Sequence, residues 1–133
     1  MRHSFSGRIF FYCYPQGPPD RAGYQHLIIA LAEGLRELGI QFYSSINYWR
    51  ISPEKEEYLF SHDPEIGPED CSIVIMNDDW FSYGMVFPKD LFHPNRKYIT
   101  VYFELNGEEL FSWKPEFRQF DFVFKTNFNR NYR

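Results

Sequence analysis

Short apolar runs recur along this chain, separated by turn residues and by one long amphipathic segment. The runs 8–14, 40–46, 71–76, 97–103 and 120–125 are rich in β-branched and aromatic residues and are predicted to be strands. The first of them is almost continuously apolar, as expected for a strand that is buried on both faces of a parallel sheet.

Segment 24–38 has helical period and is predicted to be a helix that Gly39 ends. Its apolar stripe is expected to consist of Leu27, Ile28, Leu31, Leu35 and Leu38. Gly34, inside this helix, costs about 1 kcal/mol relative to Ala, and a close contact with the sheet would explain it. A strand, a crossover helix and a returning strand form a βαβ unit.

Strands that alternate with helical stretches predict an α/β Rossmann-like fold, with a mostly parallel sheet of about five strands and helices on both faces. We expect one domain over residues 1–133, and because the pattern stops after a strand we interpret it as a domain cut from a longer polypeptide. Pro53 and the four residues after it read as a helix start, whereas 58–60 fits a short strand or the end of that helix. Residues 108–119 are predicted to form a short helix interrupted at Pro115.

Composition and charge exclude several function classes. Aromatic residues make up 21% of the chain, which excludes disorder. The net charge is −4 and no long basic stretch occurs, so nucleic acid is a disfavoured partner. Neither a signal peptide nor a transmembrane run is recognisable, which predicts a cytoplasmic protein. Cys13 and Cys71 fall in predicted strands and are expected to be buried thiols; their spacing does not suggest a metal site.

The loop 15–23, between the first strand and the helix, is the first place to expect a ligand. It is rich in Gly and Pro, and ligands of open parallel sheets bind outside the carboxyl ends of the strands. The chain carries no P-loop, no G-x-G-x-x-G fingerprint and no nucleophile elbow, and the first strand ends in Tyr14-Pro15 rather than in the acidic residues of a response regulator.

Residues 23–40 read GYQHLIIALAEGLRELGI, a glycine-containing loop that leads into a helix of the form H-x-x-x-x-x-L-A-x-x-L-x-x-x-G. This pattern, over roughly residues 8 to 45, resembles the first helix in the N-terminal domains of GT-B glycosyltransferases. The resemblance implies that this chain is the acceptor-binding half of such an enzyme, inactive without a C-terminal Rossmann-like domain. It implies a nucleotide sugar as co-substrate, a glycan or small hydroxyl acceptor, and no other cofactor.

In that family His26 matches a position where some inverting members carry their base; the alternative is a histidine that merely lies in the first turn of the helix. Glu104, at the end of a strand, is a second candidate base, and it could equally be a solvated charge at the sheet edge. Lys125 could counter a phosphate or a carboxylated sugar.

The substrate-binding candidates lie where the loop and the strand ends should meet: Gly17, Gly23, Tyr24, Gln25, Asp79, Trp80, Thr126 and Asn127. Gly23 would let the backbone approach a ligand, Asp79 could bind sugar hydroxyls, and Trp80 could stack on a sugar ring. A plain turn, a helix N-cap and a core position are the respective alternatives.

The aromatic residues also leave alternatives open. A core is expected to include Phe10, Phe11, Phe103, Phe122 and Phe124; sugar contacts would use Tyr24, Tyr48, Trp49 and Trp80; an interface would use Trp49, Tyr83, Phe87 and Phe92. The rival to the transferase is a non-catalytic flavodoxin-like or receiver-like module that docks another protein.

Overall fold

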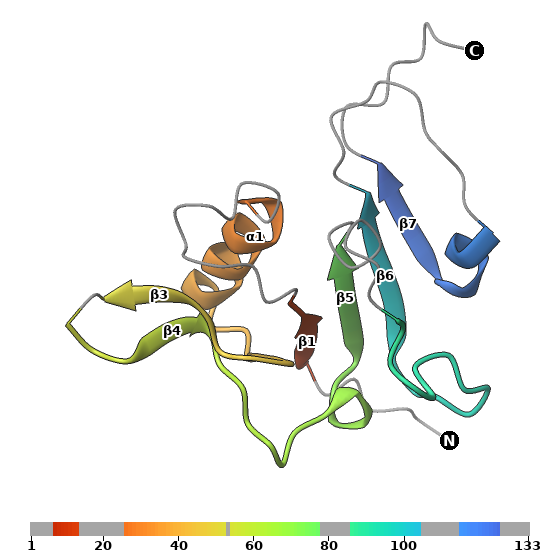
Figure 1. The fold of residues 1–133 in the computed structure, drawn as a ribbon, viewed down its shortest axis with the longest axis horizontal. Coiled ribbons are helices and arrows are strands. Elements are labelled where there is room, and N and C mark those ends of the chain that lie inside the picture. Colours follow the sequence, from red (N-terminus) through yellow and green to blue (C-terminus); the bar gives the residue numbers. More distant parts are fainter. Residues whose placement is uncertain (1–6, 14–25, 53, 78–85, 105–114, 126–133) are drawn as a thin grey trace, which may run out of the picture.

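A computed structural model describes residues 7–13, 26–52, 54–77, 86–104 and 115–125 (Figure 1). The strands are β1 (Ile9–Tyr12), β2 (Phe42–Ser44), β3 (Tyr48–Ser52), β4 (Glu57–Phe60), β5 (Ile73–Asn77), β6 (Ile99–Glu104) and β7 (Phe122–Lys125). The helices are α1 (His26–Glu37) and two 3-10 helices, η3 (Pro68–Asp70) and η4 (Pro115–Gln119).

Five strands form one parallel sheet in the order β2-β1-β5-β6-β7. This arrangement confirms the predicted α/β Rossmann-like class and all five predicted sheet strands, with ends shifted by at most two residues. The chain leaves β1 toward β2 on one side and later continues from β5 toward β7 on the other side. The order of the strands therefore reverses between β1 and β5, and such a switch point is where open α/β sheets bind ligands.

The helix α1 ends as the sequence predicts. Gly39 has a φ of +73°, its N–H donates to the Arg36 carbonyl, and the Ile40 N–H donates to the Leu35 carbonyl. These two bonds are those of a Schellman motif, which satisfies carbonyls that the helix itself leaves without donors.

The buried face of α1 differs from the predicted stripe. The buried residues are Ile28, Ile29, Ala32 and Leu35, whereas Leu27 is 39% exposed and Leu38 is 76% exposed. The helix is thus rotated from the expected position, so that the small Ala32 meets the sheet. Gly34 is exposed with open space around it, so the close contact proposed for it is wrong.

Two apolar clusters cover the two faces of the sheet. The helix-side core joins α1 to Ile9, Phe11 and Ile75 and to the β3–β4 hairpin. The loop-side core joins the opposite face to the loop 86–98, through Leu91 and Tyr98, and to η4 through Phe117. Within the described residues α1 is the one α-helix, so on the loop-side face a loop and a 3-10 helix take the place of the α-helix expected there. None of the described helices is long and apolar enough to cross a membrane.

The region around Pro53 is a hairpin, which corrects the predicted helix start. Strands β3 and β4 pair in antiparallel fashion around a turn at 54–56. Leu59 and Phe60 do not show the apolar–polar alternation of a half-buried strand. Both lie in the helix-side core, and their burial there favours a strand over a helix in this segment. The acidic side chains of this region project into solvent, as the hairpin turn requires.

Several aromatic residues and the cysteines lie elsewhere than predicted. Phe122 and Phe124 are 52% and 49% exposed, so they are not core residues. Phe87 and Phe92, expected at an interface, instead pack edge-on against Phe120 in the loop-side core. Tyr48 is buried rather than available to a sugar. Tyr83 lies outside the described residues.

Both cysteines are free and buried, as expected, but they flank strands instead of lying within them. Cys13 follows β1 and belongs to the helix-side core, whereas Cys71 precedes β5 and belongs to the loop-side core.

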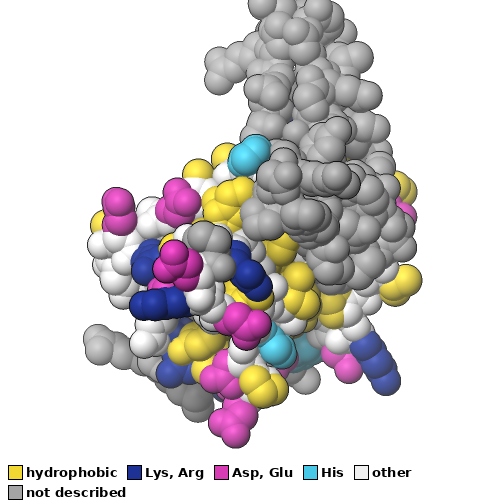
Figure 2. Space-filling model, turned by 60° about the vertical axis from the view of Figure 1, so that its left-hand side comes forward, with side chains coloured by type: hydrophobic (Ala, Val, Ile, Leu, Met, Phe, Trp, Pro, Cys, Tyr) yellow, Lys and Arg dark blue, Asp and Glu magenta, His cyan; other side chains and the backbone are white. Residues whose placement is uncertain are grey.

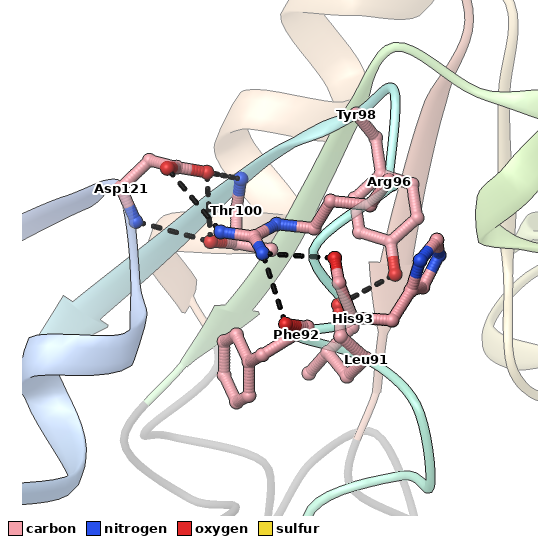
Figure 3. A network of polar contacts seen from close by, with 7 residues as sticks. All are labelled: Leu91, Phe92, His93, Arg96, Tyr98, Thr100 and Asp121. Carbon is pink, nitrogen blue, oxygen red and sulfur yellow. Dashed lines mark hydrogen bonds and ion pairs between the residues drawn. The ribbon is translucent and has the colours of Figure 1, made fainter.

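A polar network fastens the amino end of β6 to the residue before β7 (Figure 3). The Asp121 carboxylate accepts bonds from the Thr100 N–H at 2.8 Å and the Thr100 hydroxyl at 3.1 Å, and the Asp121 N–H donates back to Thr100 Oγ1 at 3.0 Å. Arg96 lies 3.5 Å from the other Asp121 oxygen and donates to the carbonyls of Phe92 and His93. The loop 86–98 is thereby tied to the sheet at this end.

Candidate functional site at the carboxyl edge of the sheet

The carboxyl ends of β1, β5, β6 and β7 lie at one edge of the sheet, because the strands are parallel (Figure 1). Three polar residues end the last three of these strands: Asn77, Glu104 and Lys125. All three side chains are largely withdrawn from water. In other open α/β sheets, ligands bind at the carboxyl ends of the strands. Because this edge also carries buried polar groups, we take it as the candidate site.

Asn77 is the most informative residue at this edge. Its side chain is fully buried, and among the described residues neither its Oδ1 nor its Nδ2 has a hydrogen-bond partner. Leaving a buried polar group unsatisfied costs about 1 to 3 kcal/mol. A group kept at such a cost needs an explanation, and a ligand that supplies the missing partners is one.

Asn77 belongs to the side of the sheet that α1 covers. Side chains alternate along β5, so Asn77 shares a face with Ile75, which packs in the helix-side core. The register Tyr12↔Met76 brings Cys13 next to Asn77 at the switch point. Burial raises the pKa of the Cys13 thiol, so this thiol stays protonated and is not a nucleophile.

Glu104 and Lys125 form an ion pair on neighbouring strands. Their closest atoms, Glu104 Oε2 and Lys125 Nζ, are 3.2 Å apart, and the side chains are 2% and 7% exposed. Glu104 shares a face with Tyr102 of the loop-side core, so it points to the side opposite Asn77. Both charged groups are therefore buried and paired, and the alternative that they are solvated charges at the sheet edge is wrong.

His26 is the first residue of α1 and is exposed. Its ring lies edge-on to the ring of Trp49, with centroids 6.2 Å apart. Trp49 has a φ of +62° in β3, a strained backbone for a bulky residue. The imidazole therefore reaches solvent on the helix side of the sheet, which it shares with Asn77, whereas Glu104 lies on the other side.

The remaining predicted site residues lie outside the described residues. They are Gly17, Gly23, Tyr24, Gln25, Asp79, Trp80, Thr126 and Asn127. The sequence prediction gave roles to Asp79 and Trp80 in the stretch 77–80 but none to Asn77, two residues before Asp79. The signal was present: one amide ends the otherwise apolar run 73–76.

The described side chains contain no group of three or more His, Cys, Asp or Glu that could hold a metal ion. On the face that carries the β3–β4 hairpin, basic and acidic side chains are interspersed rather than separated by sign (Figure 2). That face therefore offers no single-sign patch among the residues shown.

Known proteins provide no further guide to this site: no family model, no curated protein and no solved structure matches the chain.

Proposed function

We propose that this chain is the acceptor-binding half of a GT-B type glycosyltransferase, which holds a hydroxyl of a glycan or small acceptor at the carboxyl edge of its sheet. The buried, unpartnered amide of Asn77 carries the proposal. An amide offers two donors and a carbonyl acceptor, which suits it to hold a hydroxyl that both gives and takes a hydrogen bond. The resemblance of residues 23–40 supports the reaction class.

In the proposed reaction His26 is the general base. Its imidazole accepts the acceptor's hydroxyl proton while the hydroxyl oxygen bonds to the anomeric carbon and the bond from that carbon to the nucleotide diphosphate breaks. Exposure of His26 at the helix start, on the side of the sheet that Asn77 faces, is compatible with this role. The nucleotide sugar would be held mostly by a second Rossmann-like domain.

Glu104 is reassigned within this proposal from second base to positioning residue. The Glu104 side chain is 2% exposed and lies 3.2 Å from the Lys125 ammonium, so an ion pair with a buried cation stabilises its charged form and makes it a poor base. The pair would instead hold the ends of β6 and β7 together at the edge of the sheet where the acceptor is proposed to bind.

A cytoplasmic location stays a prediction.

The test is ligand-detected NMR on the 133-residue chain with short glycans and with UDP-, GDP- and dTDP-sugars. We expect saturation transfer to a glycan that Asn77→Leu abolishes and His26→Ala weakens, with Glu33→Gln on the exposed face of α1 as the matched control. Failure of every glycan to bind, or equal binding by Asn77→Leu, would contradict the proposal.

A protein-docking module is a second candidate, favoured by the exposed rings of β7. The rings of Phe122 and Phe124 are about half exposed and stack with centroids 6.3 Å apart. Exposed neighbouring aromatic rings are typical of the anchors of protein interfaces. A chain that binds no sugar but changes its oligomeric state in light scattering when both rings are replaced by serine would favour this candidate.

A further inference from the structure

A pocket lies away from Asn77, on the loop-side face of the sheet. It has a volume of about 300 Å³ and is lined by Tyr12, Pro68, Glu69, Lys89, Asp90, Leu91 and Tyr98. These residues come from the end of β1, from η3 and from the loop 86–98. We name it the tyrosine pocket.

Hydrogen bonds and an ion pair hold the walls of this pocket in place. His93 pairs with Glu69, which joins the loop to η3. The Tyr98 hydroxyl donates to the Leu91 carbonyl at 2.5 Å, and Tyr98 is 4% exposed (Figure 3). Arg96 secures the same loop through the carbonyls of Phe92 and His93. The loop 86–98 is thus held in place at both ends by its own contacts. A ligand would not have to order this loop in order to bind in the pocket.

The mixed charges around the pocket make a simple ion a poor match for it. A lone anion would meet the carboxylates of Glu69 and Asp90, and a metal ion would meet the ammonium of Lys89. A neutral ligand with several hydroxyls matches both signs, because its hydroxyls donate to the carboxylates and accept from the ammonium.

The two phenols add hydrogen-bonding groups and ring surface. Burial, and next the charge of Tyr98, raise the pKa of Tyr12 to about 12. Burial and then the charge of Glu69 raise the pKa of Tyr98, with Arg96 opposing them. Both hydroxyls therefore keep their protons at neutral pH. A phenol ring also presents an apolar face, against which the C–H surface of a sugar ring can pack.

We propose that the tyrosine pocket binds one sugar residue of a glycan, at a site separate from the Asn77 edge. The volume is at the lower end of the range for small-molecule pockets and fits one ring. The choice of a sugar over other neutral polyols rests on the proposed function, which gives the chain a glycan to hold. A glycan bound in the tyrosine pocket would add affinity without touching the reacting hydroxyl.

The experiment is saturation-transfer NMR on the 133-residue chain with methyl glycosides of glucose, galactose and mannose and with N-acetylglucosamine. The test variants are Tyr12→Phe, Glu69→Gln and Lys89→Met, which change polar atoms and keep most of the side-chain volume. Lys97→Met and Glu65→Gln, both exposed and outside the pocket lining, are the matched controls. Circular dichroism confirms that each variant is folded.

We expect each test variant to weaken binding of a monosaccharide about fivefold to tenfold, with no effect from the controls or from Asn77→Leu. A sugar whose binding depends on Asn77 and not on the pocket variants would overturn the inference and leave the proposed function standing. Monosaccharide binding that depends on the pocket variants alone would uphold the inference, and the Asn77 site would then be judged separately, by whether Asn77→Leu weakens binding of the longer glycans. Absence of all sugar binding would overturn both.

Discussion

At the amino end of β6 the hydroxyl of Thr100 is fully buried and has two partners on Asp121. At the carboxyl end of β5 the amide of Asn77 is equally buried and has no partner in the part of the chain that the structure describes. The two residues lie on adjacent strands of one sheet. A buried unpaired amide lowers the stability of the fold. The comparison therefore teaches that the polar groups at the amino edge stabilise the sheet, whereas Asn77 at the carboxyl edge is kept at a cost in stability.

The ion pair at the carboxyl edge gives the largest predicted effect. Lys125→Met removes the cation that pairs with the 2%-exposed Glu104 carboxylate, and we expect the free energy of unfolding to fall by about 3 to 5 kcal/mol. Urea unfolding measures this loss. Adding Glu104→Gln to the same chain should restore much of it, and Lys55→Met, at an exposed position, is the control. A loss no greater than that of the control would show that water already solvates Glu104.

The amino-edge network should be next in size. Asp121→Ala removes the acceptor of the Thr100 N–H and hydroxyl and the partner of Arg96, so we expect a loss of about 2 kcal/mol. The thermal unfolding midpoint reports the change, with Glu116→Ala in η4 as the control. Glycan binding at the Asn77 site should be unaffected in Asp121→Ala under conditions where it is folded, because the amino-edge network has no part in that site.

Asn77→Leu should have the opposite sign. Replacing an unsatisfied amide by an apolar side chain removes the cost of burying two unpaired polar atoms, and we expect a gain of about 1 kcal/mol. The smaller Asn77→Val guards against overpacking by Leu. If both variants were destabilised in urea, Asn77 would have a structural role and the contrast between the two edges would be lost.

Gly34→Ala is expected to have the smallest effect on stability and serves as a control for Asn77→Leu. Gly34 lies in the middle of α1, exposed and with open space where a Cβ would go, so Ala should stabilise the chain by up to about 1 kcal/mol. It therefore matches Asn77→Leu in stability while leaving ligand binding unchanged. A loss of stability in Gly34→Ala would mean that α1 packs differently around this position.

Sequence patterns predicted the parallel strands and the helix because each has a strong local signal: apolar runs for the strands, helical period and Gly39 for α1. They failed where tertiary contacts decide. The strand at Glu57–Phe60 forms because Leu59 and Phe60 enter the helix-side core, against an acidic run that favours a helix start. Phe122 and Phe124 look like core residues in sequence, and only the arrangement of the sheet shows that they are half exposed.

The candidate site was partly predictable for the same reason. Strand ends can be located from sequence, so the edge that carries Glu104 and Lys125 was expected. Pairing between these two side chains depends on the adjacency of β6 and β7, which no local pattern contains. Neither does sequence show that Asn77 is buried without a partner.

The side-chain amide of Asn77 is the group that tests the central claim most directly. In a nitrogen-15-labelled chain, its NH₂ resonances are assigned as the pair that Asn77→Leu removes. We predict that a glycan acceptor shifts this pair in a saturable manner and slows its hydrogen exchange, because the ligand supplies the partners that the protein lacks. An amide pair that no glycan shifts, and that exchanges as slowly in the free chain as a hydrogen-bonded group, would contradict the account.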